Sequence, residues 1–422
     1  MSYWPPSGTA AANALFGRRS TLVLGLALFV AVLLLRTVIV VGVGDHLAQT
    51  RPEVSLKLGR DSPEVLASAA LNAWQTRNAR LTSKYALAAL DRSPLDVRAL
   101  RVRGLGLAAQ GKTAEAETVM QFAGTRGWRD DGVQAWLLRD GIAKHHFNQA
   151  FLHADALARR RFEMWPILFR LFEIGAGNPD SAKAIAERLS KNPNWRASFL
   201  VSLETSRQND DAIERLFQLV DKGPAPLTPL ELSAYLRRLA REGRYGDALA
   251  MLRGSTNGGR LVGSPFDGGF AGLDGVVPFA WEKMAAPGAN LEMDSAPDRA
   301  SSNALRVEYD GYSATDLIRQ ALAPRPGDYL LTGEARSQDG DSTILTWQAR
   351  CAADGKVLAT ASAPTGAVNA WHRFAVRFTV PAQGCDGVWL VLAETPQDHR
   401  SSNVTWYTNL AVQPAPTAVG EK

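Results

Sequence analysis

Several short patterns in this 422-residue chain contain residue types that can bind a ligand. Gly106–Thr113 matches G-x-x-x-x-G-K-T, in which the N–H groups of a loop between a strand and a helix hold phosphate. The residues before Gly111 instead have the apolar spacing of a helix, so the required strand is missing. No second acidic motif on a hydrophobic strand accompanies the pattern. We therefore expect no nucleotide ligand.

Two further clusters contain histidine or arginine side chains. His145, His146 and His153 are close in sequence, but metal ligation needs more converging ligands than these. Arg159, Arg160 and Arg161 could contact a polyanion, although such a run is more often a solvated helix end. No nucleophile–base arrangement is recognisable. We expect no catalytic residues, no metal and no cofactor.

The two cysteines, Cys351 and Cys385, both lie in the C-terminal part of the chain. If this part is outside the cytoplasm, an oxidising compartment favours a disulfide between them. Closing a loop of about 34 residues stabilises a fold by roughly 3.8 kcal/mol in the chain-entropy model, less any strain. The alternative is two buried free thiols that behave as small apolar residues.

Thr21–Val43 is a run of 23 apolar or small residues interrupted only by Arg36. At 1.5 Å per residue it is long enough to span a hydrocarbon core of about 30 Å. Arg18 and Arg19 precede it, so the positive-inside rule places the N-terminus in the cytoplasm and the rest of the chain across the membrane. Arg36 lies near the far end, where it can reach the interface. A cleaved signal peptide is the alternative to an uncleaved anchor.

The charge is distributed unevenly along the chain. The net charge is +2 over residues 1–50, +8 over 51–256 (31 basic, 23 acidic) and −5 over 257–422 (13 basic, 18 acidic). A basic middle and an acidic end suggest different partners, or each other as partners. A solvated surface without a partner remains the simpler alternative.

Small residues recur in the middle of the chain at intervals of about 34 residues. Each follows a polar break and begins an amphipathic pattern, which is typical of helix pairs that pack closely and stack on their neighbours. The recurring positions are Thr82, Ala116, Ala150, Ala182, Ala212 and Ala248. Gly104 and Gly111 belong to the best-defined unit, as a packing residue and a turn residue.

These positions resemble the tetratricopeptide-repeat family over about residues 63–254. The matching residues include Pro94, Gly104, Gly111 and Ala116. The resemblance implies a curved α-solenoid that binds protein partners along its surface. A generic helical repeat array is the alternative.

After Gly254 the helical pattern stops and short alternating segments begin, among them ALRVEYDG, STILTWQAR, HRFAVRFTVP and GVWLVLAE, separated by turns such as RPGD and ADGK. This pattern predicts a β-sandwich. With PFDGGF, PFAW and the closing WYTNL, the segment resembles galactose-binding-like jelly rolls of the CenC carbohydrate-binding type. The resemblance implies glycan contacts through Trp281, Trp371 or Trp406, although most tryptophans of a sandwich lie in its core. Ala271 and Thr408 replace acidic residues that help relatives hold calcium, which argues against calcium here.

We therefore predict an α + β multidomain protein with one transmembrane helix, an α-solenoid and an antiparallel jelly-roll sandwich. The expected boundaries are 1–20 leader, 21–43 membrane helix, 44–62 linker, 63–254 repeats, 255–262 linker, 263–415 sandwich and 416–422 tail.

The two resemblances together are similar to bacterial accessory proteins of exopolysaccharide or envelope assembly. They imply a non-enzymatic scaffold in the inner membrane with a periplasmic body, protein partners on the repeats, polysaccharide as a further partner and no nucleic acid. Two alternatives are a carbohydrate-active enzyme with its site between repeats and sandwich, and a structural protein whose sandwich caps the solenoid.

Overall fold

A computed structural model gives the structure of the protein. It describes residues 9–207, 210–258, 263–272, 275–299, 302–310, 316–338, 345–362, 368–394 and 403–416, with side chains from residue 23 onward. The chain divides into two compact units, Met1–Arg160 and Arg161–Lys422.

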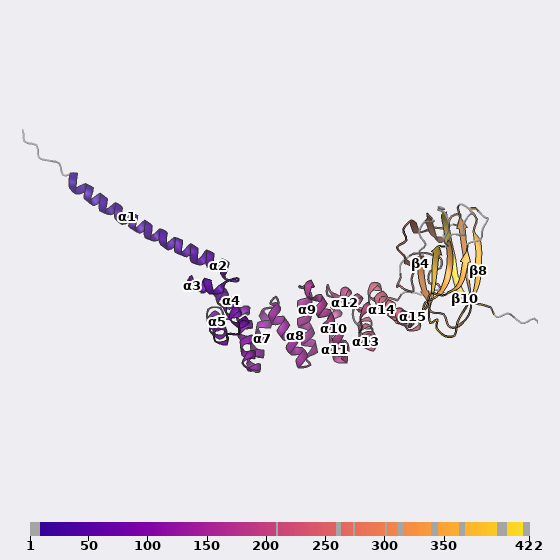
Figure 1. The fold of residues 1–422 in the computed structure, drawn as a ribbon, viewed down its shortest axis with the longest axis horizontal. Helices are drawn as coiled ribbons and strands as arrows, with labels where there is room; N and C mark the ends of the chain where they lie inside the picture. Colours follow the sequence, from indigo (N-terminus) through magenta and orange to yellow (C-terminus); the bar gives the residue numbers. More distant parts are fainter. Residues whose placement is uncertain are drawn as a thin grey trace, which may run out of the picture. The chain divides into compact units, whose positions relative to one another are not determined.

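The first unit begins with one long apolar helix, α1 (Thr9–Val38), drawn in indigo in Figure 1. A π-helical turn, η1 (Ile39–Val43), and the short helix α2 (Gly44–Leu47) continue it. The stretch Val23–Leu47 has a mean hydropathy of 2.8 and is long enough to cross a membrane. Its large side chains have no protein core to pack against, since Leu28 is 68% exposed. Such a surface is unfavourable in water. The expected apolar helix is confirmed, as an anchor or a signal.

The rest of the first unit consists of antiparallel helix pairs (Figure 1). A short helix α3 (Pro52–Lys57) leads into them. The paired helices are α4 (Pro63–Gln75) with α5 (Ala79–Arg92), α6 (Val97–Ala109) with α7 (Thr113–Arg126), and α8 (Asp131–Ala143) with α9 (Phe147–Ala158).

The turn inside each of these pairs has the same geometry. One residue in it has positive φ: 57° at Arg77, 76° at Gly111 and 59° at His145, at intervals of 34 residues. The next N–H donates to the carbonyl five positions back, in the bonds Asn78–Ala73, Lys112–Leu107 and His146–Gly141. This left-handed helix ending satisfies carbonyls that the helix leaves unpaired. Gly111 is thus a turn residue between two helices, and Gly106–Thr113 has no strand before it.

Helices also begin the second unit. Their bounds are α10 (Trp165–Gly175), α11 (Pro179–Leu189), α12 (Arg196–Ser202), α13 (Asp210–Asp221), α14 (Pro229–Arg241) and α15 (Tyr245–Gly254), with 3₁₀ turns η2 (Phe162–Met164) and η3 (Leu203–Thr205). Gly243, between α14 and α15, has φ 79°, and Arg244 N–H again donates to the carbonyl five positions back, on Leu239.

The small residues at the recurring positions lie at helix–helix contacts. Thr82, Ala116, Ala150, Ala182, Ala212 and Ala248 are all between 0% and 4% exposed. Gly104 faces Met120, whose Cγ would be 2.8 Å from an added Cβ. A larger side chain at these places would push the helices apart, because cores are packed to near-crystalline density.

The C-terminal part of the second unit is a sandwich of two five-stranded sheets, ordered β1-β4-β9-β6-β7 and β2-β3-β10-β5-β8. All pairings between these strands are antiparallel. The strands are β1 (Glu282–Lys283), β2 (Ala289–Ser295), β3 (Asn303–Tyr309), β4 (Asp316–Leu322), β5 (Gly327–Ser337), β6 (Leu345–Cys351), β7 (Val357–Ser362), β8 (His372–Val380), β9 (Val388–Glu394) and β10 (Asn403–Pro414). The predicted fold class, an apolar helix, helical hairpins and an antiparallel sandwich, is confirmed.

A disulfide joins Cys351, at the end of β6, to Cys385, just before β9. The two Cα atoms are 5.4 Å apart, inside the range that a disulfide requires. β6 and β9 are neighbouring strands in which Cys351 pairs with Val388, so the sheet itself brings the two cysteines together. The predicted disulfide is confirmed, and together with the apolar helix it suggests a location outside the cytoplasm.

Candidate functional site: an aromatic and arginine surface on the sandwich

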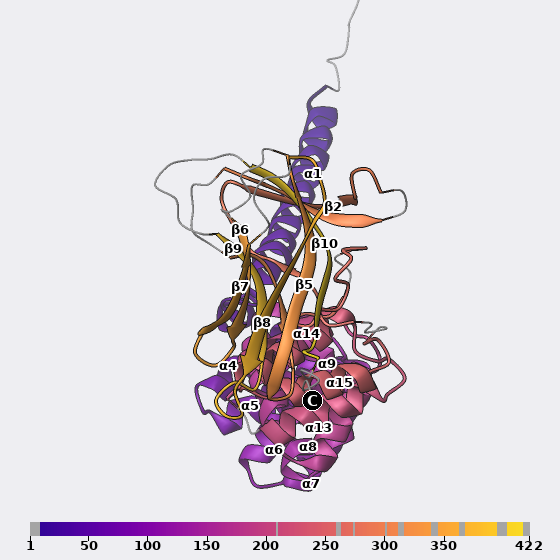
Figure 2. The same ribbon diagram turned by 90° about the vertical axis from the view of Figure 1, so that its right-hand side faces the viewer.

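The outer face of the second sheet carries polar and aromatic side chains because residues alternate along each strand. On β5, Leu331 and Ala335 point into the core, so Glu334 and Arg336 point outward. On β10, Tyr407 is in the core and Trp406 points outward. Figure 2 shows β10, β5 and β8 as neighbouring strands.

Trp406 lies in the middle of a row that crosses four strands. Its register partners are Arg306 on β3 and Arg336 on β5, and Arg306 in turn pairs with Glu292 on β2. The Arg336 guanidinium is 5.7 Å from the centre of the Trp406 ring. Residues directly opposite on one face are close enough to interact. The result is a half-exposed indole with a guanidinium on each side.

Both arginines are held in place by acidic or amide groups. Arg306 forms ion pairs with Glu292 at 3.6 Å and with Glu308 at 3.1 Å. Arg336 contacts Asp298 at 3.1 Å and the side-chain oxygen of Asn369 at 3.3 Å. These guanidinium groups are thereby oriented beside the ring, and such orientation is what a polar ligand site needs.

Trp371 lies beside this row but is already engaged. Its Nε1 donates to the Pro297 carbonyl at 3.0 Å. The Arg299 guanidinium lies 4.5 Å from the ring centre, in cation–π geometry. One face and the N–H of this indole are therefore used inside the protein, so Trp371 holds the segment around Pro297.

Glu334 lies on the same face of the sheet and contacts Arg299, which lies over the Trp371 ring. It is 8% exposed and accepts hydrogen bonds from Arg299, from Arg373 at 3.1 Å and from Asn409 at 3.5 Å. Burial would raise the pKa of Glu334, but the bonds from Arg299 and Arg373 outweigh this effect and hold the pKa below its ordinary value. Glu334 is thus a charged carboxylate at neutral pH.

Trp281 is a core residue, and the expectation of a glycan contact there is wrong. Trp281 is 3% exposed, and its ring stacks on Phe270 with ring centres 5.1 Å apart. Its Nε1 donates to the Asp267 carbonyl at 2.9 Å. A sugar ring cannot reach an indole that is enclosed in this way.

The positions compared with a calcium site have local roles. The carboxylate of Asp267, in the PFDGGF segment, accepts from the N–H groups of Ala271 at 2.8 Å and Gly272 at 3.1 Å. Thr408 is 2% exposed and donates to the Asn303 carbonyl at 2.8 Å. Among the residues that the structure describes, no cluster of three or more metal-ligating side chains occurs.

The three consecutive arginines each have an acidic neighbour. Arg159 binds Asp155 at 2.8 Å and Arg160 binds Asp131 at 2.6 Å, both in the first unit. Arg161, in the second unit, lies 3.4 Å from Glu163. A guanidinium that is already paired is less available to a polyanion, so these residues fit a solvated helix end.

The histidines separate into two environments. The rings of His145 and His146 are exposed. His153 is half-buried: its Nδ1 lies 2.7 Å from Gln134 Oε1 and its ring stacks on Trp128 with centres 5.7 Å apart. Desolvation by burial lowers the pKa of His153, so the ring is neutral at pH 7.

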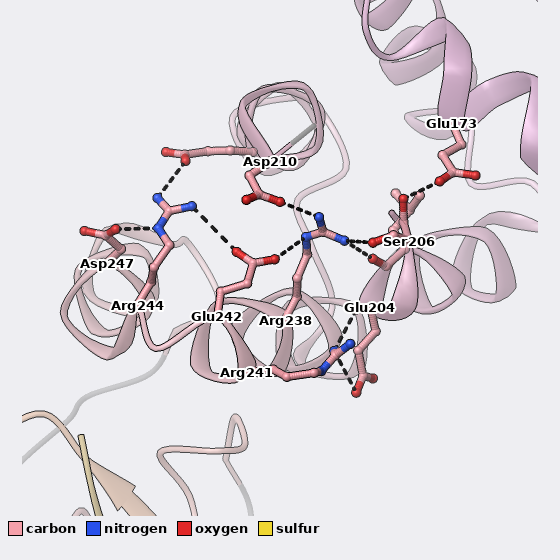
Figure 3. A network of polar contacts seen from close by, with 11 residues as sticks. Glu173, Glu204, Ser206, Asp210, Arg238, Arg241, Glu242, Arg244 and Asp247 are labelled. Carbon is pink, nitrogen blue, oxygen red and sulfur yellow. Dashed lines mark hydrogen bonds and ion pairs between the residues drawn. The ribbon is translucent and has the colours of Figure 1, made fainter. Parts of the chain in front are cut away.

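A network of charged residues lies on the helices of the second unit (Figure 3). Arg238 on α14 is 4% exposed and contacts the Ser206 carbonyl at 2.6 Å, Asp210 at 2.5 Å and Glu242 at 3.1 Å. Burial raises the pKa of Glu242, and Arg238 opposes this rise. Because Arg238 joins α13, α14 and the end of η3, we interpret the network as structural. Figure 3 shows the same guanidinium between these elements.

Sequence reasoning named Trp406 but missed Arg306, Arg336, Glu334 and Arg299. The alternating pattern of β3 and β5 places polar residues on one face, so it could have identified the first three as surface residues. Their position beside Trp406 depends on strand register, which the pattern does not contain.

No family model and no curated protein matches the sequence. The C-terminal sandwich resembles solved structures of carbohydrate-binding modules. One is CBM4, with 13% identity, a TM-score of 0.28 and coverage of 36% of this chain and 99% of that one. A putative sugar binding protein from Bacteroides thetaiotaomicron has 11% identity, a TM-score of 0.26 and coverage of 37% and 100%.

The enzymatically active domain of a tailspike protein from bacteriophage CBA120 has 13% identity and a TM-score of 0.27, over 36% of this chain. This chain spans only 21% of that protein's length. At these values the likeness concerns strand arrangement, and nothing about a ligand follows from it.

Proposed function

We propose that this protein is a membrane-anchored, non-enzymatic scaffold that binds a glycan through its sandwich and a partner protein through its helix pairs. The observation that carries the proposal is Trp406, a half-exposed indole on an open sheet face between Arg306 and Arg336. The role in polysaccharide or envelope assembly is the fuller form of the same proposal.

The chemistry of this face suits a sugar. The C–H groups of a sugar ring pack on the electron-rich face of an indole, and the hydroxyl groups around the ring both donate and accept hydrogen bonds. The ion pairs of Arg306 with Glu292 and of Arg336 with Asp298 use only part of the donors and acceptors of these groups, and the remaining ones can bond to hydroxyl groups. Few precisely placed polar groups around an apolar platform are typical of small-ligand sites.

The helix pairs offer a separate surface for a protein partner. A groove of about 560 Å³ runs over α4, α6 and α8, and its walls include Trp74, Leu105, Trp136 and Arg139. Trp74 is 38% exposed, and in the described chain Arg139 has no ion-pair partner. An apolar groove with an unpaired cation at its edge fits an apolar segment that carries a carboxylate. Such a surface supports the resemblance to tetratricopeptide repeats.

The proposed location is the inner membrane of a bacterium, with the N-terminus in the cytoplasm and the body in the periplasm. Arg18 and Arg19, directly before the apolar run Thr21–Val43, support this orientation. The Cys351–Cys385 disulfide supports an oxidising compartment for the sandwich.

The alternative of a carbohydrate-active enzyme requires catalytic groups where the helices meet the sandwich. A pocket of about 220 Å³ lies there, within the second unit, and the titratable residues in its described lining are Arg253 and Tyr329. Glycoside hydrolysis generally uses two carboxyl groups on either side of the bond. The composition of this pocket supports the non-enzymatic proposal.

A second candidate function, a sandwich that caps the helical array, has its own support. Tyr245 on α15 is 5% exposed and packs edge-on against Trp389 of β9, with ring centres 6.4 Å apart. Glu282 of β1 lies 3.5 Å from Arg237 of α14 and 2.9 Å from Arg319. These contacts bury a helix end that would otherwise be exposed.

The glycan proposal can be tested on the full chain in lipid nanodiscs, which avoid detergents with sugar head groups. Cellotetraose and chitotetraose would be titrated by calorimetry. We expect Trp406→Ala to weaken binding about tenfold and Trp406→Phe to retain most of the affinity, because a phenyl ring still stacks.

Phe162→Ala, a change at an exposed aromatic residue outside the sandwich, is the control and should bind as the unchanged protein does. Equal affinity of Trp406→Ala and the unchanged protein would exclude the sandwich face as the site. If Trp406→Ala has no effect on binding and Trp389→Ala lowers the stability of the protein, a cap on the helices is the better description of the sandwich.

A further inference from the structure

A pocket of about 420 Å³ lies between α7 and α9 of the first unit, over the end of α8. Its volume is in the range of about 300–1,000 Å³ that is typical of small-molecule sites. It is separate from the groove over α4, α6 and α8, which different side chains line. Neither the sandwich nor the disulfide contributes to it.

The pocket has an aromatic wall. Trp128, in the turn between α7 and α8, is 44% exposed. His153 on α9 stacks on the ring with an interplanar angle of 24° and ring centres 5.7 Å apart. His153 supports one side of the indole, so the ring keeps its orientation while much of its surface stays open.

Buried contacts determine the hydrogen-bonding state of His153. Gln134 is fully buried, and its amide nitrogen donates to the Gly127 carbonyl at 3.2 Å. The amide oxygen of Gln134 must then face His153, so Nδ1 of the ring carries the proton and donates to it. Nε2 is consequently the unprotonated nitrogen of the neutral ring, an acceptor with no protein donor in the described chain.

Further polar groups in the pocket lack partners in the part of the chain that the structure describes. They are the side-chain amide of Gln149, which both donates and accepts, and the indole N–H of Trp128, which donates. Together with His153 they present donors and acceptors around one aromatic ring. A ligand with several hydroxyl groups satisfies such a mixed set, whereas a ligand with only donors or only acceptors does not.

The charges at the rim argue against an acidic ligand. Glu117 and Asp140 both contact Lys144, at 2.7 Å and 2.9 Å. Two carboxylates and one ammonium leave the rim with one net negative charge. An anionic polymer would be repelled, and a cation would compete with Lys144 for carboxylates that are already paired.

From these observations we infer that the pocket between α7 and α9 is a second glycan site, which takes a neutral sugar ring stacked on Trp128. The inference extends the proposed glycan-binding function, and it gives the chain two separate contacts for one polymer. Two weak sites on one chain bind a long glycan more tightly than either alone, provided the polymer spans both.

The experiment uses the full chain in nanodiscs with Trp406→Ala already introduced, so that binding at the sandwich face is weakened. Cellotetraose and chitotetraose are the probes. We expect residual binding that Trp128→Ala weakens about tenfold, and a shift of the Trp128 indole ¹⁵N–¹H signal during titration. Phe162→Ala, at an exposed aromatic residue outside both the pocket and the groove, should change neither result.

Gln149→Leu provides a second variant, because Gln149 is exposed and its loss should not disturb folding. We expect it to weaken binding at least threefold with an unchanged melting temperature. Complete loss of binding in Trp406→Ala alone would overturn the second site and leave the sandwich proposal intact. Binding that Trp406→Ala leaves unchanged, and that Trp128→Ala by itself removes, would do the reverse. Absence of binding of both probes to the unchanged protein would overturn both.

A basic tetrapeptide, Lys-Trp-Lys-Lys, serves as the competing ligand. If it binds the pocket and shifts the Trp128 signal while neither oligosaccharide does, the site recognises a cationic peptide and the glycan inference is wrong.

Discussion

Arg196 and Glu231 form a two-point ion pair inside the second unit. Arg196 Nε lies 2.9 Å from Oε1 and Nη2 lies 2.8 Å from Oε2, and the two side chains are 3% and 2% exposed. Arg196 also donates to the carbonyls of Ala225 and Pro226, at 3.0 Å and 2.9 Å. Glu231 accepts from the Thr228 N–H as part of a capping box at the start of α14. The pair therefore joins α12, a loop and α14.

Removal of one partner of this pair should destabilise the second unit strongly. Glu231→Gln leaves a buried guanidinium without its counter-charge, and the typical cost is about 3–5 kcal/mol. Hydrogen exchange of peptides from α12 and α14, read by mass spectrometry, measures the loss locally. The double change Arg196→Met with Glu231→Leu should recover much of it. Unchanged exchange in Glu231→Gln would mean that the pair is solvated.

Ala116 should not tolerate a large side chain. It is fully buried on α7, so Ala116→Phe overpacks a helix contact at a typical cost of about 1–3 kcal/mol. Peptides from α6 and α7 should exchange faster. Ala114→Phe, at an exposed position of the same helix, is the control and should leave exchange unchanged. Equal effects of the two changes would contradict the assigned packing face.

The disulfide should resist alkylation and stabilise the sandwich. Protein purified without reductant should yield no alkylated Cys351 or Cys385 peptide in mass spectrometry. Cys351→Ala and Cys385→Ala open the same 34-residue loop, so each should cost up to about 3.8 kcal/mol by the chain-entropy model. Two freely alkylated cysteines would argue against both the bond and an oxidising location.

The stability of the sandwich should fall on acidification. The folded-state pKa of Glu334 is below its ordinary value, and the unfolded value is about 4.3. The stabilisation from its ionised form is therefore present above the unfolded pKa and is lost as pH falls through the folded pKa. Melting between pH 3 and 7, followed by tryptophan fluorescence, measures this loss.

Glu334→Gln should flatten the acid side of that profile. Glu308→Gln, on the same face with a side chain that is 50% exposed, is the control and should keep the slope. An identical acid slope in Glu334→Gln and the unchanged protein would remove Glu334 from the explanation.

The orientation in the membrane can be read with reporters. A reporter that is active only in the periplasm, fused after Lys422, should be active, because the positive charges before the apolar run Thr21–Val43 keep the N-terminus in the cytoplasm. Activity of a cytoplasmic reporter at the same position would reverse the assignment. Retention of the chain in washed membranes, compared with release into the soluble fraction, would decide between an anchor and a cleaved signal.

Local patterns in the sequence are enough to predict the helices and strands of this protein. The continuous apolar run Thr21–Val43 predicts the first helix from composition alone, because so many apolar side chains are unfavourable in water. The 34-residue spacing predicts the helix pairs because the turn at Gly111 recurs in the same form at Arg77 and His145. Alternation predicts the strands of the sandwich, since each strand has one face in the core.

The functional surfaces depend on contacts between residues far apart in the chain, and only the tertiary structure decided them. Trp281 and Trp406 look equivalent in sequence, yet the first stacks on Phe270 in the core and the second points outward beside Arg336. Strand register places Trp406 outside the core, because a shift by one residue would exchange the two faces of β10. The pocket at Trp128 likewise forms only when α9 packs against α8 and brings His153 to the ring.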